Sequence, residues 1–132
     1  FSEHWGEVRT YALDRIKAVA EAPGVHFREP SEPPGEYFRD VIGITRYEDT
    51  RPVRVVLKFP SRQAPYILTQ PLHRSQKVEK KTDEYTIVSL KVHPSPELEI
   101  ILLGWHSDVE VVEPARLRER LRQLHLKAAE VL

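Results

Sequence analysis

Hydrophobic and polar positions alternate through the middle of the chain as they do in half-buried strands. The segment Pro52 to Phe59 places Val53, Val55, Leu57 and Phe59 on one side, and two basic residues with one valine on the other. A period of two with many β-branched residues favours a strand with one buried face. We therefore predict the first core strand here.

The same period predicts a hairpin further along the chain. Residues Leu72 to Val78 and Glu84 to Val92 flank the polar turn Glu79 to Asp83, which suits the connection between two antiparallel strands. A last short strand is predicted over Val109 to Val112. Four strands are therefore available for one sheet.

Helical signals lie before and after the first strand. Tyr37, Val41 and Ile44 have helical spacing, which predicts a short helix over 36–44 that ends near Gly43. After the strand, Ser61 is expected to cap a second helix that continues to about residue 68.

Two further helices are predicted in the last third of the chain. Ser95 precedes Pro96, the favoured first residue of a helix, and we expect this helix to end at Gly104. Pro114 begins the final helix. This helix carries an apolar stripe of Leu117, Leu121, Leu124, Ala128 and Val131.

The order from Pro52 is strand, helix, strand, strand, helix, strand, helix. Two strand-helix-strand units joined by a hairpin predict an α+β fold of the ferredoxin-like (split βαβ) type, with both helices on one face of an antiparallel sheet. The final helix is an addition to this plan, expected to cover an edge or to join a neighbour.

The start of the chain is organised differently. Val8 to Ile16 alternates like a strand, and no methionine precedes it, so we expect a piece of a longer protein. Four prolines in residues 23–35 predict an extended linker. The expected organisation is an incomplete terminal segment over residues 1–22, the linker over 23–35, and an independent domain over 36–132.

Composition and charge exclude some classes of function. The 132 residues are 40% hydrophobic and 30% charged with a formal net charge of zero, so no overall field attracts nucleic acid. No cysteine is present, which rules out disulfides and thiolate chemistry and agrees with a reducing, cytoplasmic location. The apolar runs are much shorter than the roughly 20 residues that cross a bilayer, so no membrane span is expected.

Several phrases in fixed order resemble a known family. Arg9-x-Tyr11-x-Leu13-Asp14-Arg15-Ile16 resembles the last strand of the WYL domain, a small Sm-like β-barrel of bacterial transcriptional regulators. The later phrases resemble the family's C-terminal extension, the WCX domain. They are Tyr37-Phe38-x-Asp40-x-Ile42-Gly43, Pro71-Leu72-His73-x-Ser75-Gln76, Glu97-Leu98, Gly104, and Val109-Glu110-Val111-x-Glu113-Pro114-x-x-Leu117-Arg118.

The resemblance implies a function without catalysis. It implies the C-terminal effector-sensing and dimerisation module of a regulator whose helix-turn-helix head, absent from this chain, binds DNA. The arginines Arg9 and Arg15, with Tyr11, are then expected to bind a nucleic-acid or nucleotide effector, since arginine grips phosphate bidentately. Solvent-exposed strand arginines are the alternative interpretation. The Trp-Tyr-Leu tripeptide of the barrel is missing.

Two other groups of residues are candidates for a functional site. His73, Arg74 and Gln76 offer polar groups on a predicted strand. They are expected to contribute to the nucleic-acid or nucleotide site; the alternatives are a small-molecule or catalytic site, an inter-subunit contact, or a half-exposed strand surface. The final helix carries four arginines that form either a nucleic-acid surface or a solvated face paired with preceding acids; they are Arg116, Arg118, Arg120 and Arg122. A purely structural dimerisation domain is a third possibility.

Enzymatic and cofactor signals are absent from the sequence. The six histidines have no metal-ligand spacing, the five glycines are scattered, and no serine lies in a nucleophile elbow. We expect no metal, no cofactor and no enzyme, and a homodimer as the assembled form.

Overall fold

The computed structural model describes residues 1–132, and the chain divides into two compact units, Phe1–Arg39 and Asp40–Leu132. All of the buried hydrophobic residues, from Val41 to Leu121, belong to the second unit. The second unit therefore has its own core.

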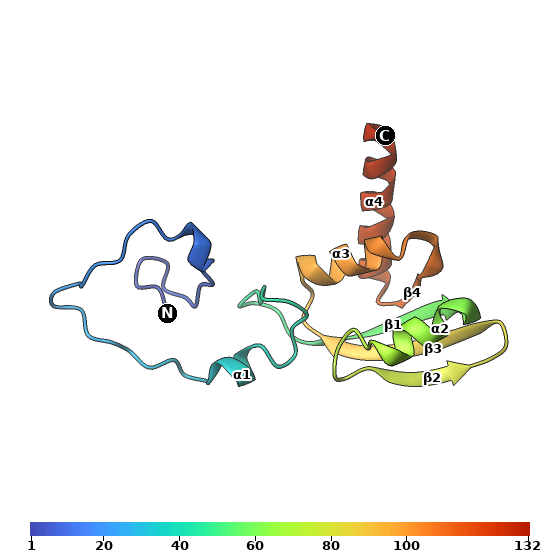
Figure 1. The fold of residues 1–132 in the computed structure, drawn as a ribbon, viewed down its shortest axis with the longest axis horizontal. Coiled ribbons are helices and arrows are strands. Elements are labelled where there is room, and N and C mark those ends of the chain that lie inside the picture. Colours follow the sequence, from blue (N-terminus) through green and yellow to red (C-terminus); the bar gives the residue numbers. More distant parts are fainter. The chain divides into compact units, whose positions relative to one another are not determined.

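The second unit is built on one sheet of four antiparallel strands (Figure 1). The strands are β1 (Val53–Pro60), β2 (Lys77–Lys81), β3 (Tyr85–Val92) and β4 (Glu110–Glu113), in the spatial order β2-β3-β1-β4. Helix α2 (Ala64–Thr69) connects β1 to β2, and α3 (Pro96–Gly104) connects β3 to β4. This is the ferredoxin-like arrangement, so the predicted fold class is confirmed.

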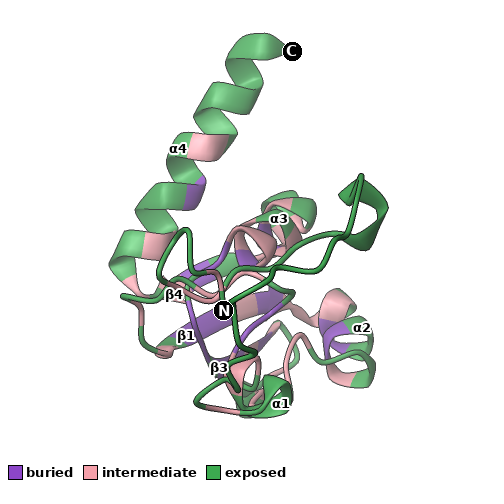
Figure 2. Cartoon of the chain, turned by 90° about the vertical axis from the view of Figure 1, so that its left-hand side faces the viewer, coloured by how far each residue is buried: buried purple, intermediate pink, exposed green.

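The core lies on one face of this sheet, beneath both connecting helices. In the register of the two central strands, Val55 pairs with Leu90 and Leu57 with Val88, and paired residues of neighbouring strands point to the same face. These four side chains are buried, and they form one cluster with Ile67 of α2 and with Leu98 and Leu102 of α3. The alternation in the sequence therefore identified the covered face correctly (Figure 2).

Helix α3 has the predicted start. The hydroxyl of Ser95 accepts a hydrogen bond from the amide of Leu98 at 3.2 Å, and Pro96 is the first helical residue. After β4, Pro114 is the N-cap residue of α4 (Ala115–Val131). This last helix extends beyond the sheet (Figure 1).

The expectation that Ser61 caps α2 is wrong. Residues Ser61–Gln63 form a 3-10 turn, so the α-helix begins only at Ala64 and the hydroxyl of Ser61 receives no capping hydrogen bond. The amide of Ser61 instead donates to the carbonyl of Glu84 at 2.9 Å, which joins this turn to the beginning of β3.

The expected hairpin exists, but its first strand was predicted five residues too early. The strand begins at Lys77 rather than Leu72. The side chain of Gln76 folds the preceding residues into a turn, because it accepts from the amide of Leu72 at 2.9 Å and donates to the carbonyl of Ile67 at 2.9 Å. The hairpin turn is centred on Thr82, whose hydroxyl accepts from the amides of Glu84 and Tyr85.

The helix predicted over 36–44 is also wrong in extent. Only α1 (Pro34–Tyr37) is helical, and it belongs to the first unit. Val41 and Ile42 are instead buried in the second unit, where Gly43 adopts a φ of +83°. α1 ends at Tyr37 with Phe38 as its C-cap residue, so Gly43 does not end a helix; the segment that follows Gly43 is held by α3.

The first unit contains little regular structure. Residues Leu13–Arg15 form a 3-10 turn, Ser2 and Glu7 form an isolated bridge, and no helix or strand is present between Ile16 and Pro33. The strand predicted over Val8 to Ile16 is therefore absent. A strand requires a neighbour that satisfies its backbone groups, and the first unit supplies none.

Candidate functional site

The segment 40–50 lies against the N-terminal end of α3 and shapes the candidate site. The amide of His93 donates to the carbonyl of Asp40 at 2.8 Å, and the hydroxyl of Ser95 donates to the carbonyl of Ile42 at 3.3 Å. These hydrogen bonds fasten the beginning of the segment to the turn between β3 and α3.

Glu97 fastens the next part of the segment. Its Oε1 accepts from the amides of Ile44 and Thr45, each at 3.1 Å, and from the hydroxyl of Thr45 at 2.8 Å. Burial alone would raise the pKa of Glu97, but these donors and its own amide outweigh it, so its pKa lies below the usual 4.5. Its second carboxylate oxygen is buried without a hydrogen bond. Glu97 is therefore an anionic anchor for residues 43–45.

His93 supports the end of the segment. Its side chain is buried, and its Nδ1 lies 2.9 Å from the hydroxyl of Thr50. Burial and the charge of Arg46 lower the pKa of His93 below the usual 6.5, against the opposing effect of Asp40. The neutral imidazole is therefore the form that fits the folded domain.

A cavity of about 620 Å³ lies between this segment, the first strand, α3 and the first turns of α4. Its floor is apolar and includes Val53, Val55, Leu98 and Leu117. Charged groups also line it, two from α4 and one each from α3 and the 47–50 loop; they are Arg116, Arg120, Glu99 and Asp49. The volume lies within the range of small-molecule sites, roughly 300–1,000 Å³.

The four arginines of α4 have different surroundings. Arg118 donates to the carbonyl of Val112 at 2.9 Å, Arg120 pairs with Glu99 at 3.1 Å, and Arg122 pairs with Glu119 at 3.6 Å. The side chain of Arg116 makes no hydrogen bond or ion pair within the chain, and it lines the cavity. The arginines therefore do not form one continuous basic surface.

The acids that precede α4 pair with other elements. Glu113 pairs with Arg54 at 3.1 Å and Glu110 with Lys58 at 3.6 Å, both on β1, while Asp108 pairs with Arg62. The interpretation that these acids pair with the arginines of α4 is wrong. β4 lies beside β1, which brings Glu110 and Glu113 to the basic residues of that strand, and Asp108 meets Arg62 in the 3-10 turn that follows β1.

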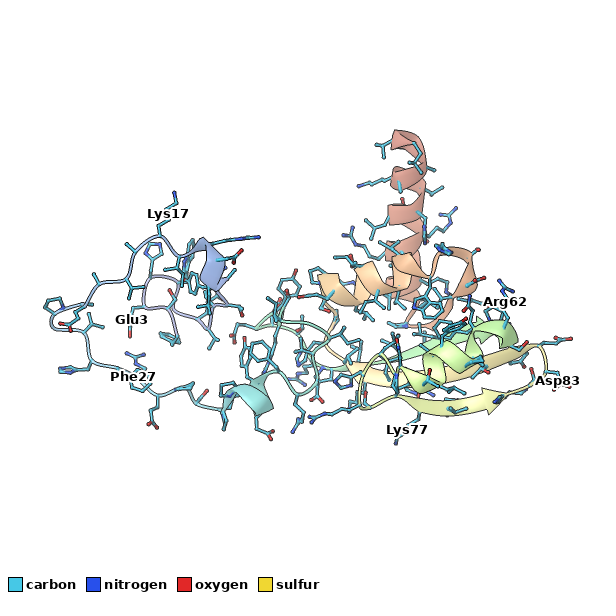
Figure 3. The ribbon with its side chains drawn as sticks, in the orientation of Figure 1. Glu3, Lys17, Phe27, Arg62, Lys77 and Asp83 are labelled. Atoms are coloured by element: carbon cyan, nitrogen blue, oxygen red, sulfur yellow. The ribbon has the colours of Figure 1, made fainter.

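The residues His73, Arg74 and Gln76 lie in the turn before β2 (Figure 3 marks the neighbouring Lys77). Gln76 holds this turn, as described above, and the Nδ1 of His73 lies 2.7 Å from the hydroxyl of Ser75. That hydroxyl also contacts the amide and carbonyl of Lys91 on β3. The polar groups of His73 and Gln76 therefore stabilise the turn, and they do not lie on a strand.

The three residues expected to bind an effector in the first unit are exposed. Arg9 forms an ion pair with Glu7 and lies 4.7 Å from the ring centroid of Trp5. Tyr11, two residues before the 3-10 turn, and Arg15, its last residue, are both exposed. Arg9 therefore contacts Glu7 and Trp5, and the three residues do not form a pocket together.

The face of the sheet opposite the core carries a polar network that the sequence did not reveal. Arg54 contacts both Glu113 and Glu79, and the hydroxyl of Ser89 donates to Glu79. The hydrogen bond from Ser89, and to a smaller degree Arg54, lowers the pKa of Glu79. Lys58 also lies over the ring of Tyr85, 4.8 Å from its centroid. No helix covers this face.

Sequence reasoning missed the 40–50 segment, Glu97 and His93 as site-forming residues. Two signals were available: Gly43, which the sequence explained only as a helix end, and Glu97 as the second residue of a helix capped by Ser95. Neither signal indicates that the two lie in contact, because 54 positions separate them along the chain. No cluster of three or more histidine, cysteine or acidic side chains is arranged to hold a metal ion. None of the helices is long and apolar enough to cross a membrane.

The strand order and the helices on one face define the second unit as a ferredoxin-like α+β domain. The chain belongs to the WCX-domain family, whose model matches residues 51–129. WCX domains are the C-terminal extension of WYL-containing regulators, so the matched segment is a regulatory C-terminal domain of this type. No curated protein matches the chain. The segment 40–50 lies outside the matched residues.

Proposed function

We propose that this chain is the C-terminal regulatory module of a WYL-type transcriptional regulator, that it pairs two subunits, and that it catalyses no reaction. The match to the WCX family supports the regulatory role. In this proposal residues 1–22 complete a WYL barrel, and a helix-turn-helix in the full regulator binds DNA. The barrel would supply the neighbouring strands that Val8 to Ile16 lacks here.

The effector in this proposal is a nucleic acid or nucleotide that meets Arg9, Tyr11 and Arg15. The exposure of Tyr11 and Arg15 is compatible with such a role. An effector changes the output of a regulator only when it binds two arrangements of the subunits with different affinity. The contact between subunits is therefore the part of the proposal to test first.

The observation that carries the pairing is the exposure of the outer half of α4. The inner part of its stripe packs on the domain, with Leu121 buried and Leu117 and Leu124 partly buried. The same stripe continues through Ala128 and Val131, where every residue from 125 to 132 is exposed (Figure 2). Isolated helical segments shorter than about 12–15 residues are only marginally stable in water, so a second copy of α4 would stabilise the unpacked outer half.

Sedimentation equilibrium of the purified chain tests this proposal. We expect a reversible dimer, and we expect the double substitution Ala128→Glu with Val131→Glu to weaken association at least tenfold, since it places two charges on the apolar stripe. Leu126→Glu is the matched control, because Leu126 is also exposed but points to the opposite side of the helix. A monomeric parent chain, or equal effects of both changes, would contradict pairing through this stripe.

A further inference from the structure

The cavity beside α4 has the features of a ligand site that the regulatory role does not require. Its floor consists of aliphatic side chains from three elements, among them Val53 of β1, Leu98 of α3 and Leu117 of α4. An apolar floor of this kind binds a compact hydrocarbon or aromatic group by excluding water from both surfaces. The floor therefore favours a ligand with an apolar body.

The charged residues at the edge of the cavity determine which polar group the ligand carries. Arg120 and Glu99 neutralise each other through their ion pair of 3.1 Å. The guanidinium of Arg116 has no partner in the chain, although it lines the same cavity. Arginine binds carboxylates through two parallel hydrogen bonds. The unpaired cation therefore favours an anionic group at this edge.

The beginning of α4 adds to this preference. No side chain caps the helix, and its first turn contains no acidic residue. The first turn of α3, by comparison, is capped by Ser95 and carries Glu97 and Glu99. The positive end of α4 is thus uncompensated, and Pro114 and Arg116 bring it to the cavity wall. The cavity and the guanidinium carry the inference, and the helix end supports it.

We propose that this cavity binds a small organic acid with an apolar body, whose carboxylate pairs with Arg116 and whose body lies on Val53, Val55, Leu98 and Leu117. Asp49 lies on the same rim without a partner in the chain, so an acid that also carries an amino group has a contact for it. Simple acids and apolar amino acids both carry the carboxylate that Arg116 binds. Asp49 distinguishes them, because only the amino acids carry an amino group that can pair with it.

The position of the cavity gives binding a structural consequence. One wall is the 47–50 loop and the other is α4, so a bound ligand would hold these two parts together. The loop ends in Thr50, which contacts the buried His93. The binding proposal does not depend on dimerisation and would stand if α4 pairs with nothing.

Fluorescence titration of the full chain with 8-anilinonaphthalene-1-sulfonate tests the site, since this probe has an apolar body and an anionic group. We expect saturable binding to the native protein, weakened about tenfold by Arg116→Gln, the loss of one charge-assisted contact. Arg122→Gln is the matched control, because Arg122 is exposed on the same helix but pairs with Glu119. We expect this control to change the affinity less than twofold.

Competition and mapping identify the ligand class and the place. We expect 3-phenylpropionate to displace the probe and 2-phenylethylamine to leave it bound. Phenylalanine should compete better than 3-phenylpropionate in the parent chain. In the Asp49→Asn variant we expect phenylalanine to lose this advantage. Amide chemical-shift changes should centre on residues 47–50 and 115–120. Absence of saturable binding, equal effects of the two arginine substitutions, displacement by the amine as readily as by the acid, or shifts confined to the open sheet face would each overturn the proposal.

Discussion

At the scale of single residues, the contact between Gly43 and Glu97 determines the course of the 40–50 segment. Gly43 has a φ of +83°, and a Cβ built on it would lie 2.5 Å from Cγ of Glu97. The left-handed conformation favours glycine, and the close carboxylate leaves no room for a side chain. The carboxylate can reach the amides of residues 44 and 45 only because Gly43 allows this approach.

We expect Gly43→Ala to lower the free energy of unfolding by about 1–3 kcal/mol, through backbone strain and displacement of Glu97. Urea denaturation measures the change. Gly104→Ala is the matched control: Gly104 ends α3 with a helical backbone, and a Cβ there would meet nothing within 4 Å. That control should be neutral or slightly stabilising. Equal losses from both substitutions would show that Gly43 has no special conformational role.

At the scale of elements, the 40–50 segment is held to the turn between β3 and α3 partly by a titratable group. His93 is buried beside Thr50, and its lowered pKa means that the folded state binds protons less readily than the unfolded state. The charged neighbours on the segment have opposite effects, with Arg46 lowering this pKa and Asp40 raising it. Attachment of the segment is therefore sensitive to pH.

The contribution of His93 should be complete above the usual pKa of 6.5 and should decline as the pH falls below it. We expect the free energy of unfolding of the parent chain to decrease from pH 7.5 to pH 5.5, by at most about 1.4 kcal/mol per pH unit from this group. Glu79 and Glu97, whose pKa values lie below 4.5, contribute only at lower pH. His93→Gln should flatten the dependence in urea titrations at several pH values, and an unchanged slope would disprove this account.

At the scale of the whole molecule, stability resides in one of the two units. Every buried hydrophobic residue lies between Val41 and Leu121, whereas Tyr11, Leu13, Val19 and Phe27 of the first unit are more than half exposed. Because burial of apolar surface is the main stabilising contribution to folding, the first unit adds little to the unfolding transition.

We expect a shortened chain of residues 40–132 to unfold with the same midpoint and the same urea dependence as the full chain, because the urea dependence follows the surface exposed on unfolding. A chain of residues 53–132 is the comparison. It lacks the buried Val41 and Ile42 and leaves Glu97 without its donors, so its midpoint should fall clearly. A loss of cooperative unfolding in the 40–132 chain would show that residues 1–39 are part of the core.

The amino-acid sequence by itself determined the fold class, because local signals and long-range packing agree in the second unit. Alternation in Val53–Pro60 and Tyr85–Val92 specified the buried face of the central strands, and Ser95 with Pro96 specified the start of α3. Such signals depend on neighbouring residues alone, so they can be recognised without knowing the partner element.

Only the tertiary structure decided the rest, because those features depend on residues far apart in the chain. Helical spacing over 36–44 was overridden when Ile44 and Thr45 bound Glu97, and the alternation of Val8 to Ile16 produced no strand without a neighbour to pair with. Arg116 was indistinguishable from Arg120 in the sequence. Folding placed Glu99 beside Arg120 and left Arg116 unpaired at the cavity, since charge pairing is set by the packing of α3 against α4.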